Sequence, residues 1–338
     1  MTAAGRPHPP SAVLAVDSGG SGLRVVLASD GRARSAPLTS GQPVRTGPGG
    51  IDAEHFLEQL VPMARTLMAD AGISELAAAA VGAAGLFSLG DRLHAELPDG
   101  FARELGVRRL ALACDVVTAY AGALDNRPGV VVAGGTGMIA TGTDLRDWRR
   151  ADGWGHLLGD CGGGAWIGRA GLDAAMRAFD GRRGGSAALL ARAVQTFGEP
   201  EGLPGRLYPR TDRPAVLASF APSVAACASG AGGKEPDPVA AGILRRAAAH
   251  IVDTTAAVAP AEGTFDVAFT GGLFKMGDPL LRPLAAELSE RLPGARRTAA
   301  DGDPLLGSVR IATGLAAGNL GLPVDARMLS VRTTPPDV

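Results

Sequence analysis

Residues 12–27 read AVLAVDSGGSGLRVVL, which is an apolar run, a polar glycine-rich turn and a second apolar run. The first run, Ala12–Val16, is typical of a short buried strand, and Leu23–Leu27 resumes as another. Asp17–Gly22 lies between them and is rich in the residues that favour a tight change of direction. The stretch therefore predicts a β-hairpin with a polar tip.

A similar arrangement returns at residues 130–141, which read VVVAGGTGMIAT. The strand Val130–Ala133 leads into the turn Gly134–Gly137, and a second strand follows. Two strand–turn–strand units in one chain indicate a duplicated core. A third apolar strand, Phe265–Phe269, also ends in a pair of glycines.

The rest of the chain alternates strands with helices, which is typical of the α/β class. Asp52 is a good N-cap for a first helix, in which Pro62 predicts a kink or a break. The other predicted elements are strands over 77–82 and 109–113 and helices over 116–124, 165–179 and 304–317. We expect a disordered leader (1–10), an N-terminal lobe (11–127, completed by the final helix region at about 306–325), a C-terminal lobe (128–305) and a tail (326–338).

The composition argues against several classes of partner. A length of 338 residues fits two domains, and 46% hydrophobic residues can build their cores. A net charge of −1 and only 4% aromatic residues argue against nucleic-acid binding. The most apolar run, Leu76–Phe87, is too short and too rich in glycine to span a membrane. Three widely separated cysteines predict a reducing, cytoplasmic location, and a homodimer is left open.

The three glycine turns predict a site for polyphosphate, because glycine lets backbone N–H groups approach an anion closely. Asp17 opens the first turn, where a carboxylate suits Mg²⁺, although a solvated turn aspartate is the alternative. A Walker A loop is not present, since Ala228 and Glu235 stand where it needs glycine and a hydroxyl residue. The predicted ATP-binding residues are Ser18, Gly19, Gly20, Ser21, Thr136, Gly137, Gly271, Gly272 and Lys275.

Asp115 follows the strand Leu110–Cys114 directly and begins a helix. The ends of strands in α/β sheets are where ligands bind, and phosphoryl transfer to an alcohol needs a carboxylate that deprotonates the hydroxyl. Asp115 is the best candidate for this catalytic base, although it could simply cap its helix.

Residues 153–164 read GWGHLLGDCGGG and are unusually rich in glycine. A loop that holds Trp154, His156 and Asp160 near a polar ligand such as a sugar explains this composition. The alternative for His156 is that of a buried histidine with satisfied hydrogen bonds.

These motifs, in this order over about residues 12–318, resemble the BadF/BadG/BcrA/BcrD-type ATPases and, within them, the N-acetylglucosamine and glucosamine kinases. The resemblance implies a two-domain actin/hexokinase/Hsp70-like (duplicated RNase H-like) fold with an interdomain cleft, and the use of ATP and Mg²⁺. It implies that Asp115 is the catalytic aspartate, that Asp160 belongs to the sugar-contacting segment usually written GDEGS, and that Gly85 lies where these kinases close over the sugar.

The chain departs from this pattern at the implied sugar pocket. Cys161 and Gly163 replace the usual Glu and Ser of GDEGS, and Gly50 stands where many relatives carry an Asn. The glycine-rich form of this segment is most similar to a glucosamine kinase, so we expect phosphorylation of the 6-hydroxyl of D-glucosamine by ATP. The alternatives are an N-acetylglucosamine kinase, a reductase-activating ATPase, for which the cysteines lack a suitable cluster-ligand pair, and a non-catalytic sugar-binding regulator.

Overall fold

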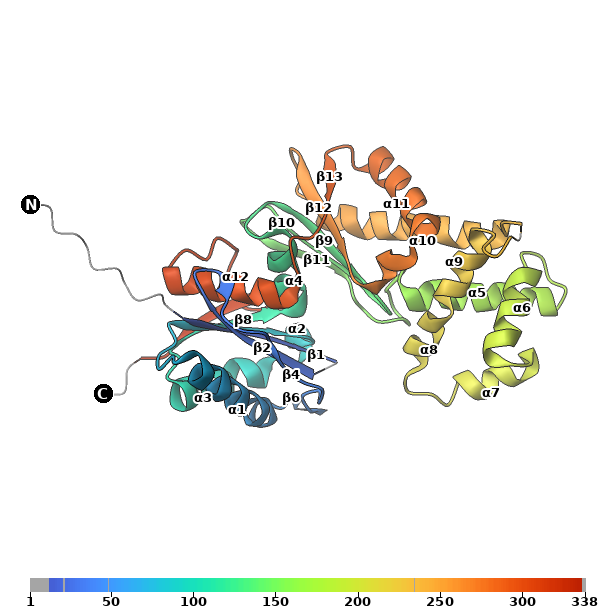
Figure 1. The fold of residues 1–338 in the computed structure, drawn as a ribbon. Coiled ribbons are helices and arrows are strands. Elements are labelled where there is room, and N and C mark those ends of the chain that lie inside the picture. Colours follow the sequence, from blue (N-terminus) through green and yellow to red (C-terminus); the bar gives the residue numbers. More distant parts are fainter. Residues whose placement is uncertain (1–11, 21, 48, 234, 336–338) are drawn as a thin grey trace, which may run out of the picture. The chain divides into compact units, whose positions relative to one another are not determined.

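The computed structural model describes residues 12–20, 22–47, 49–233 and 235–335 (Figure 1). The chain forms two compact units. The first unit takes its described residues from Met1–Arg127, Asp144–Trp148 and Ala300–Val338, and the second from Pro128–Thr143 and Arg149–Ala299. The predicted leader lies outside the described residues.

The first unit is built on a mixed sheet with the strand order β14-β8-β7-β1-β2-β3, with β4 also pairing with β2. Strands β1, β7 and β8 run parallel to one another, and β2 runs antiparallel to β1. Its elements are β1 (Val13–Gly19), β2 (Gly22–Ser29), β3 (Arg32–Ala33), β4 (Leu38–Ser40), β5 (Thr46–Gly47), β6 (Gly50–Ile51), α1 (Ala53–Ala71), β7 (Ala78–Ala83), α2 (Leu86–Leu89), α3 (Asp91–Leu105), β8 (Arg109–Cys114), α4 (Asp115–Leu124), α12 (Pro304–Ala317) and β14 (Leu329–Thr333).

Helices cover both faces of this sheet, which explains why its strands are continuous apolar runs. In Figure 1, α4 and α12 lie on one side of the sheet and α1 and α3 on the other. Helices α4 and α12 approach each other very closely, because glycines meet at their crossing. A side chain at Gly122 would collide with the carbonyl of Asp303, and one at Gly307 with the carbonyl of Thr118.

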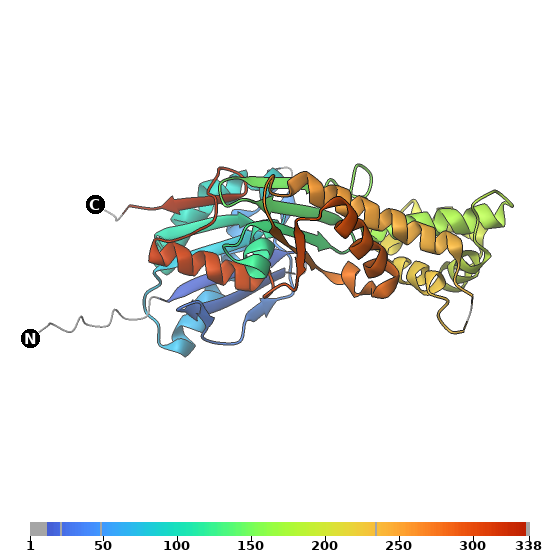
Figure 2. The same ribbon diagram turned by 90° about the horizontal axis from the view of Figure 1, so that it is seen from above.

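The second unit has a five-stranded sheet with the order β11-β10-β9-β12-β13. The long helix α10 packs on β9 and β10. Beyond the sheet it contacts helices α5 and α9, which lie beside it in Figure 2. Its elements are β9 (Gly129–Gly134), β10 (Met138–Thr143), β11 (Trp148–Asp152, which begins in the first unit), α5 (Gly164–Phe179), α6 (Ala187–Phe197), η1 (Pro200–Gly202), α7 (Leu203–Leu207), α8 (Arg213–Ser219), α9 (Ala221–Ala228), α10 (Pro238–Val258), β12 (Phe265–Thr270), η2 (Gly272–Met276), α11 (Asp278–Arg291) and β13 (Ala295–Thr298).

The duplicated core expected from the sequence is present. In the first unit, β1 has an antiparallel hairpin partner, β2, on one side and a parallel strand, β7, on the other. In the second unit, β9 stands in the same relation to its hairpin partner β10 and to the parallel strand β12. The first two glycine turns close these two hairpins, one in each unit.

Two expectations about secondary structure need correction. A break of the first helix at Pro62 is wrong, because α1 runs from Ala53 to Ala71 and buries Phe56, Leu60 and Ala64 on both sides of the proline. The alternative of a kink at Pro62 stays a prediction. The region 326–338 is not only a tail, because β14 pairs antiparallel with β8 at the edge of the sheet. Within the described part of the chain, no helix is both long and apolar enough to cross a membrane.

Candidate active site

The first unit brings three of its predicted site segments to one edge of its sheet. The parallel register aligns Ser18 of β1 with Ala83 of β7, and Ala83 with Cys114 of β8. The turn after β1, Gly85 after β7 and Asp115 after β8 therefore follow the carboxyl ends of three adjacent parallel strands. This is the edge at which open α/β sheets bind their ligands.

Asp115 is half-buried and is the first residue of α4. Its Oδ1 accepts a hydrogen bond from the backbone N–H of Val116 at 2.9 Å, and its carbonyl accepts one from the hydroxyl of Thr118 at 2.9 Å. Helix α4 has Cys114 as its N-cap and no side-chain cap at that residue. The carboxylate is thus held in place by the start of the helix while it stays at the strand edge.

Asp17 forms an ion pair that the sequence analysis did not include. Nε and Nη2 of Arg24 both donate to Oδ2 of Asp17, at 3.0 and 2.6 Å, and Nη1 donates to Oδ2 of Asp303 at 2.5 Å. Asp17 and Arg24 are direct partners in the β1–β2 register. The pair could have been predicted from the sequence, because residues at equal distances from the centre of a hairpin turn lie opposite each other. Burial alone would lower the pKa of Arg24, but the hydrogen bonds and charges of Asp17 and Asp303 raise it above its ordinary value.

Gly50 and Gly85 both have a left-handed backbone, with φ of +92° and +79°. A Cβ at Gly50 would lie 2.5 Å from the carbonyl oxygen of Leu89, so the backbone excludes the Asn that many relatives carry there. Gly85 caps α2, and the preceding residue, Ala84, donates its N–H to the carbonyl of Ser18 at 2.9 Å. The segment after β7 is therefore tied to the first glycine turn.

In the second unit, the two remaining glycine turns lie against each other. Thr270 of β12 pairs with Ala133 of β9, and the next residue, Gly271, has a φ of +97°. A Cβ at Gly271 would collide with the carbonyl oxygen of Gly134. By contrast, an added Cβ at Gly135 or Gly272 would meet no atom within 4 Å. The paired turns therefore leave open space where a phosphate chain could approach the backbone.

The start of helix α5 stabilises the turn Gly134–Gly137 through backbone hydrogen bonds. The N–H of Gly164 donates to the carbonyl of Gly135 at 2.9 Å, and the N–H of Ala165 to that of Thr136 at 2.8 Å. These bonds use donors of the first turn of α5, which have no partner within the helix. Thr136 and Gly137, which were predicted to bind ATP, thus lie in a turn that is hydrogen-bonded to the start of α5.

Asp160 lies inside the second unit, with only 8% of the residue exposed. Its Oδ1 accepts the N–H of Gly155 at 3.1 Å, and its Oδ2 lies so close to Gly137 that a Cβ there would collide with it. Burial raises the pKa of Asp160, against the opposing effect of the hydrogen bond from Gly155. Its own N–H donates to Oδ1 of Asp152 at 2.6 Å. Asp152 is a further residue that the sequence analysis missed.

Trp154 and His156 lie on the same loop but in different surroundings. Trp154 is 62% exposed, and the guanidinium of Arg150 lies over its ring, 4.6 Å from the centroid. Nε2 of His156 is buried and has no hydrogen-bond partner within the described residues. A buried ring nitrogen without a partner is rare in folded proteins, so it is a candidate contact for a bound ligand.

Lys275 lies on η2, directly after the Gly271–Gly272 turn. Its side chain is exposed and forms no ion pair with any described residue. The neighbouring Phe274 packs on Phe269 with ring centroids 5.1 Å apart, which fixes the backbone of η2. Ser21, the remaining predicted ATP-binding residue, lies outside the described residues.

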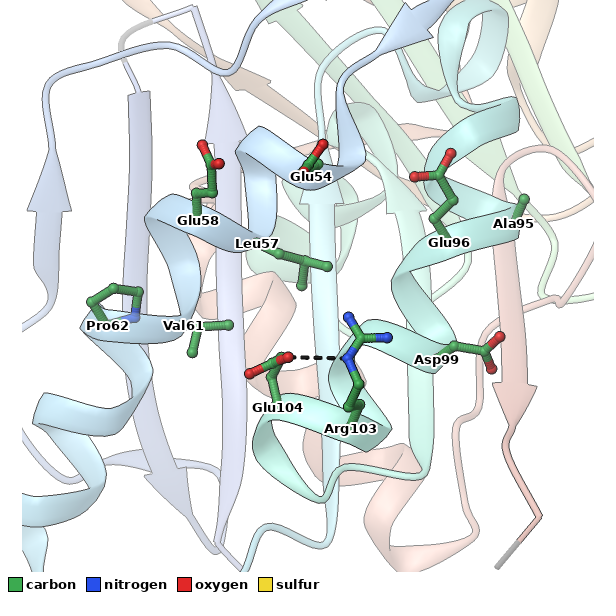
Figure 3. A pocket seen from close by; sticks show the side chains of 10 residues that line it. All are labelled: Glu54, Leu57, Glu58, Val61, Pro62, Ala95, Glu96, Asp99, Arg103 and Glu104. Carbon is green, nitrogen blue, oxygen red and sulfur yellow. Dashed lines mark hydrogen bonds and ion pairs between the residues drawn. The ribbon is translucent and has the colours of Figure 1, made fainter. Parts of the chain in front are cut away.

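A separate hollow of about 670 Å³ lies on the first unit between α1 and α3 (Figure 3). Leu57 and Val61 extend from α1 toward α3 and form an apolar part of its lining, and carboxylates such as Glu54 and Asp99 also line it. The lining also includes Arg103, which pairs with Glu104 at 3.0 Å. None of the described residues predicted to bind ATP or sugar lines this hollow, so it is not the candidate site.

The model of the BadF/BadG/BcrA/BcrD ATPase family matches residues 14–309, which is most of the chain. The chain belongs to this family. The match confirms the family that the glycine turns, Asp115 and the GDCGG segment predicted.

A curated protein of similar sequence gives more detail. The N-acetylmuramic acid/N-acetylglucosamine kinase of Clostridium acetobutylicum is 33% identical over 112 residues, which are 32% of this chain and 36% of that protein. The aligned part thus spans about a third of that relative's length.

Solved structures confirm the predicted fold class. A Chromobacterium violaceum protein provisionally named N-acetylglucosamine kinase is 26% identical, with a TM-score of 0.60 over 89% of this chain and 98% of that one. The ROK family glucokinase of Streptomyces griseus, solved with glucose and AMPPNP, is 19% identical, with a TM-score of 0.52 over 91% and 99% of the two chains. At this identity the glucokinase shows only that the fold is shared.

The residues of this ATPase family member fit a nucleotide and its magnesium ion. In the first unit, an added Cβ at Gly19 or Gly20 would meet no atom within 4 Å, and in the second unit the same holds for Gly135 and Gly272. Each unit thus offers backbone N–H groups that a phosphate could approach. Both Arg24 bonds end on Oδ2 of Asp17, and no described residue bonds to Oδ1. The described chain has no cluster of three or more metal-binding side chains. A single carboxylate is compatible with Mg²⁺, which usually keeps several waters and binds substrate phosphates.

Proposed function

We propose that this protein is an ATP-dependent kinase that phosphorylates the 6-hydroxyl of an amino sugar, with D-glucosamine as the first candidate. The observation that supports this most strongly is the register of β1, β7 and β8. It aligns the strand ends that precede the first glycine turn, Gly85 and Asp115. The family match and the name of the Clostridium acetobutylicum relative add to it.

In the proposed reaction, Asp115 accepts the proton of the sugar hydroxyl as that oxygen attacks the γ-phosphorus. The bond between the γ-phosphorus and the β–γ bridging oxygen breaks, and ADP leaves with that oxygen. The hydrogen bond from the N–H of Val116 to Oδ1 orients the carboxylate of Asp115, and the bond from the Thr118 hydroxyl to its carbonyl holds the backbone of the same residue. A general base requires such a fixed direction. The glycine turns would hold the ATP phosphates, and Lys275 would add a positive charge beside the Gly271–Gly272 turn. Asp17 would hold Mg²⁺, which neutralises charge on the transferring phosphoryl group.

Within the first unit, Gly85 is the residue proposed to contact the sugar. Within the second unit, the proposed sugar contacts are Trp154, His156 and Asp160, which lie on one loop. His156 carries a buried nitrogen that a sugar hydroxyl could satisfy. The exposed ring of Trp154 offers an apolar surface for a sugar ring.

N-acetylglucosamine is the second candidate substrate, and two observations favour it. The Clostridium acetobutylicum and Chromobacterium violaceum proteins are both named for the acetylated sugar. In addition, glucosamine carries an ammonium group that needs a carboxylate partner. Asp160 is the carboxylate of the predicted sugar loop, but it is buried and already accepts a hydrogen bond from the N–H of Gly155. The amine of glucosamine would then need another partner.

The experiment is the ratio of kcat/KM for glucosamine over N-acetylglucosamine, measured with purified protein and saturating Mg-ATP. A ratio above one supports glucosamine as the substrate, and a ratio below one assigns the acetylated sugar instead. Glucose and mannosamine serve as comparison sugars. Absence of phosphoryl transfer to any of the four would contradict the proposed function. The cytoplasmic location suggested by three free cysteines stays a prediction.

A further inference from the structure

We propose that the hollow between α1 and α3 is a docking site for a basic amphipathic helix of a partner protein. The hollow belongs to the first unit, and none of the described residues assigned to ATP or sugar lines it. The inference therefore goes beyond the proposed kinase reaction and does not depend on it.

An apolar strip lies between the two helices of the hollow. Leu57 and Val61, one turn apart on α1, extend toward α3 (Figure 3). Helix α3 has no side chain where Leu57 approaches it, because a Cβ at Gly100 would lie 2.4 Å from Cδ1 of Leu57. Pro62 and Ala95 are exposed and extend this apolar lining. The strip offers apolar surface that a partner could cover.

Carboxylates line the hollow on both helices. Arg103 is the cation among its lining residues, and the carboxylates are Glu54, Glu58, Glu96, Asp99 and Glu104. The whole chain has a net charge of −1, so this negative surplus is local. Glu54 and Glu58 are also one turn apart on α1, a spacing at which like charges destabilise a helix. A cationic partner would relieve this repulsion.

Arginines beside the hollow neutralise part of this charge. Glu58 pairs with Arg45 at 3.5 Å, and Glu96 pairs with Arg92 at 2.9 Å. All four side chains are largely exposed, so water and salt screen both pairs. These arginines therefore do not prevent a second cation from approaching.

Glu54 and Asp99 form no ion pair with any residue in the described part of the chain. Both are exposed. Arg103 lies one turn after Asp99 on α3, at a spacing that suits an ion pair. However, its Nε pairs with Glu104 at 3.0 Å instead. One unpaired carboxylate on each helix is thus left for a partner.

A contact between the two helices fixes the hollow before any partner binds. Nη2 of Arg65, on α1, donates to both Oε2 and the carbonyl oxygen of Glu104, on α3, at 3.1 Å. Together with the close approach of Leu57 to Gly100, this contact joins α1 to α3. A preformed site lowers the ordering cost of binding.

The chemistry of this lining selects a basic amphipathic helix. A groove between two helices can receive the side chains of a third helix. Its apolar face would cover Leu57 and Val61, while Lys or Arg on its two edges would reach the carboxylates of α1 and α3. The volume of about 670 Å³ lies within the range of about 300–1,000 Å³ that is typical of binding clefts. Such charge complementarity also excludes acidic partners.

The first experiment titrates the full chain, without ATP or sugar, with a synthetic amphipathic helix of leucine, alanine and lysine. A peptide with glutamate in place of every lysine is the control. Calorimetry should detect binding of the lysine peptide and none of the glutamate peptide. Raising the salt concentration from about 0.15 M to about 1 M shortens the screening length from about 8 to about 3 Å and should weaken binding about tenfold. No binding of the lysine peptide, or equal binding of both peptides, would overturn the proposal.

Charge variants locate the binding. Glu54→Gln combined with Asp99→Asn removes the two unpaired carboxylates and should weaken binding of the lysine peptide about fivefold, the loss expected for two exposed ion pairs. Asp70→Asn combined with Glu75→Gln is the matched control, because both residues are exposed and lie outside the hollow. It should change the affinity by less than about twofold. Equal losses in the two double variants would show that only net charge matters and would overturn the docking site.

A substitution at the apolar strip tests the site in a second way. Ala95→Lys adds a cation to the lining and should weaken binding of the lysine peptide about fivefold. Ala69→Lys, at an exposed position of α1 outside the hollow, is its control and should have little effect. Equal effects of the two lysines would contradict the proposal. Should the Glu54→Gln and Asp99→Asn variant fail to fold, this comparison decides.

Spermine separates a peptide partner from a small polyamine. It carries the positive charge but cannot cover Leu57 and Val61, so it should bind much more weakly than the lysine peptide. Equally tight binding of spermine would overturn the assignment to a helical partner. If the protein phosphorylated no amino sugar, the proposed function would fail, while these titrations would still decide whether the hollow is a docking site.

Discussion

The hairpins β1–β2 and β9–β10 share one topology, but their turns are stabilised in different ways. The turn of β1–β2 is next to a cross-strand ion pair, in which Arg24 bonds both Asp17 and Asp303. The turn of β9–β10 has no such pair and is held by backbone bonds from α5 and by the buried carboxylate of Asp160. The turn of the first hairpin is thus stabilised by ion pairs, and the turn of the second by backbone hydrogen bonds and close packing. Substitutions should therefore affect the two copies differently.

The largest effect is expected at Asp115, at the sheet edge of the first unit. Asp115→Asn should lower kcat by about 10²–10⁴-fold, because the amide cannot accept the hydroxyl proton. Sugar binding, measured by calorimetry, should persist. Retention of more than about a tenth of the wild-type kcat would show that Asp115 is not the base.

The contact-based turn of the second unit predicts the next effect. Gly271→Ala should destabilise the protein by about 2 kcal/mol or more, since it combines left-handed strain with a collision against Gly134. Gly263→Ala is the control, because Gly263 has a φ of +79° but no atom within 4 Å of an added Cβ. Denaturant unfolding of both variants measures the difference. Equal losses would mean that the contact with Gly134 contributes nothing.

The charge-based turn of the first unit predicts a change in metal dependence. Asp17→Asn should raise the Mg²⁺ concentration for half-maximal activity about tenfold, which is about 1.4 kcal/mol. Asp303→Asn removes the other partner of Arg24 but keeps an N-cap for α12, because Asn caps as well as Asp. It should leave the Mg²⁺ requirement unchanged. Equal shifts in both variants would assign the effect to Arg24 and exclude Asp17 as the metal ligand.

The smallest effect concerns pH and stability. Burial raises the pKa of Asp160 in the folded state, so the stability linked to its proton is present below about pH 4 and is lost as pH rises through the raised value. Wild-type stability relative to Asp160→Asn should therefore fall between about pH 4 and neutral pH. For Asp144, backbone hydrogen bonds from Arg146 and Asp147 lower the pKa, so the corresponding difference should fall as pH drops below about 4. Unfolding free energies measured over this pH range test both signs.

Much of the fold could be predicted because its signals are local. The apolar runs before each glycine turn predict strands by their composition, and Asp52 accepts the N–H of His55 as an N-cap should. A break at Pro62 was wrong because the buried face of α1 outweighs the single backbone hydrogen bond that proline removes. Strand β14 was missed because its pairing with β8 joins segments more than 200 residues apart, which no local pattern reveals.

The candidate site was predictable to a similar extent. Strand ends could be placed at one edge of a sheet, and the Asp17–Arg24 pair follows from the hairpin register. The inward direction of Asp160 could not be read from the sequence. It depends on the left-handed backbone at Asp160 and on the distant carboxylate of Asp152, which are set by the packed loop.

The most direct test of the kinase assignment is the formation of ADP by the purified protein with and without an amino sugar. The account predicts that ADP forms in equal amounts with the 6-phosphate of the sugar, identified by NMR of the product. Without sugar, ADP formation should be negligible. ADP formation at the same rate in the presence and absence of sugar would contradict the account and would favour an ATPase that is not a sugar kinase.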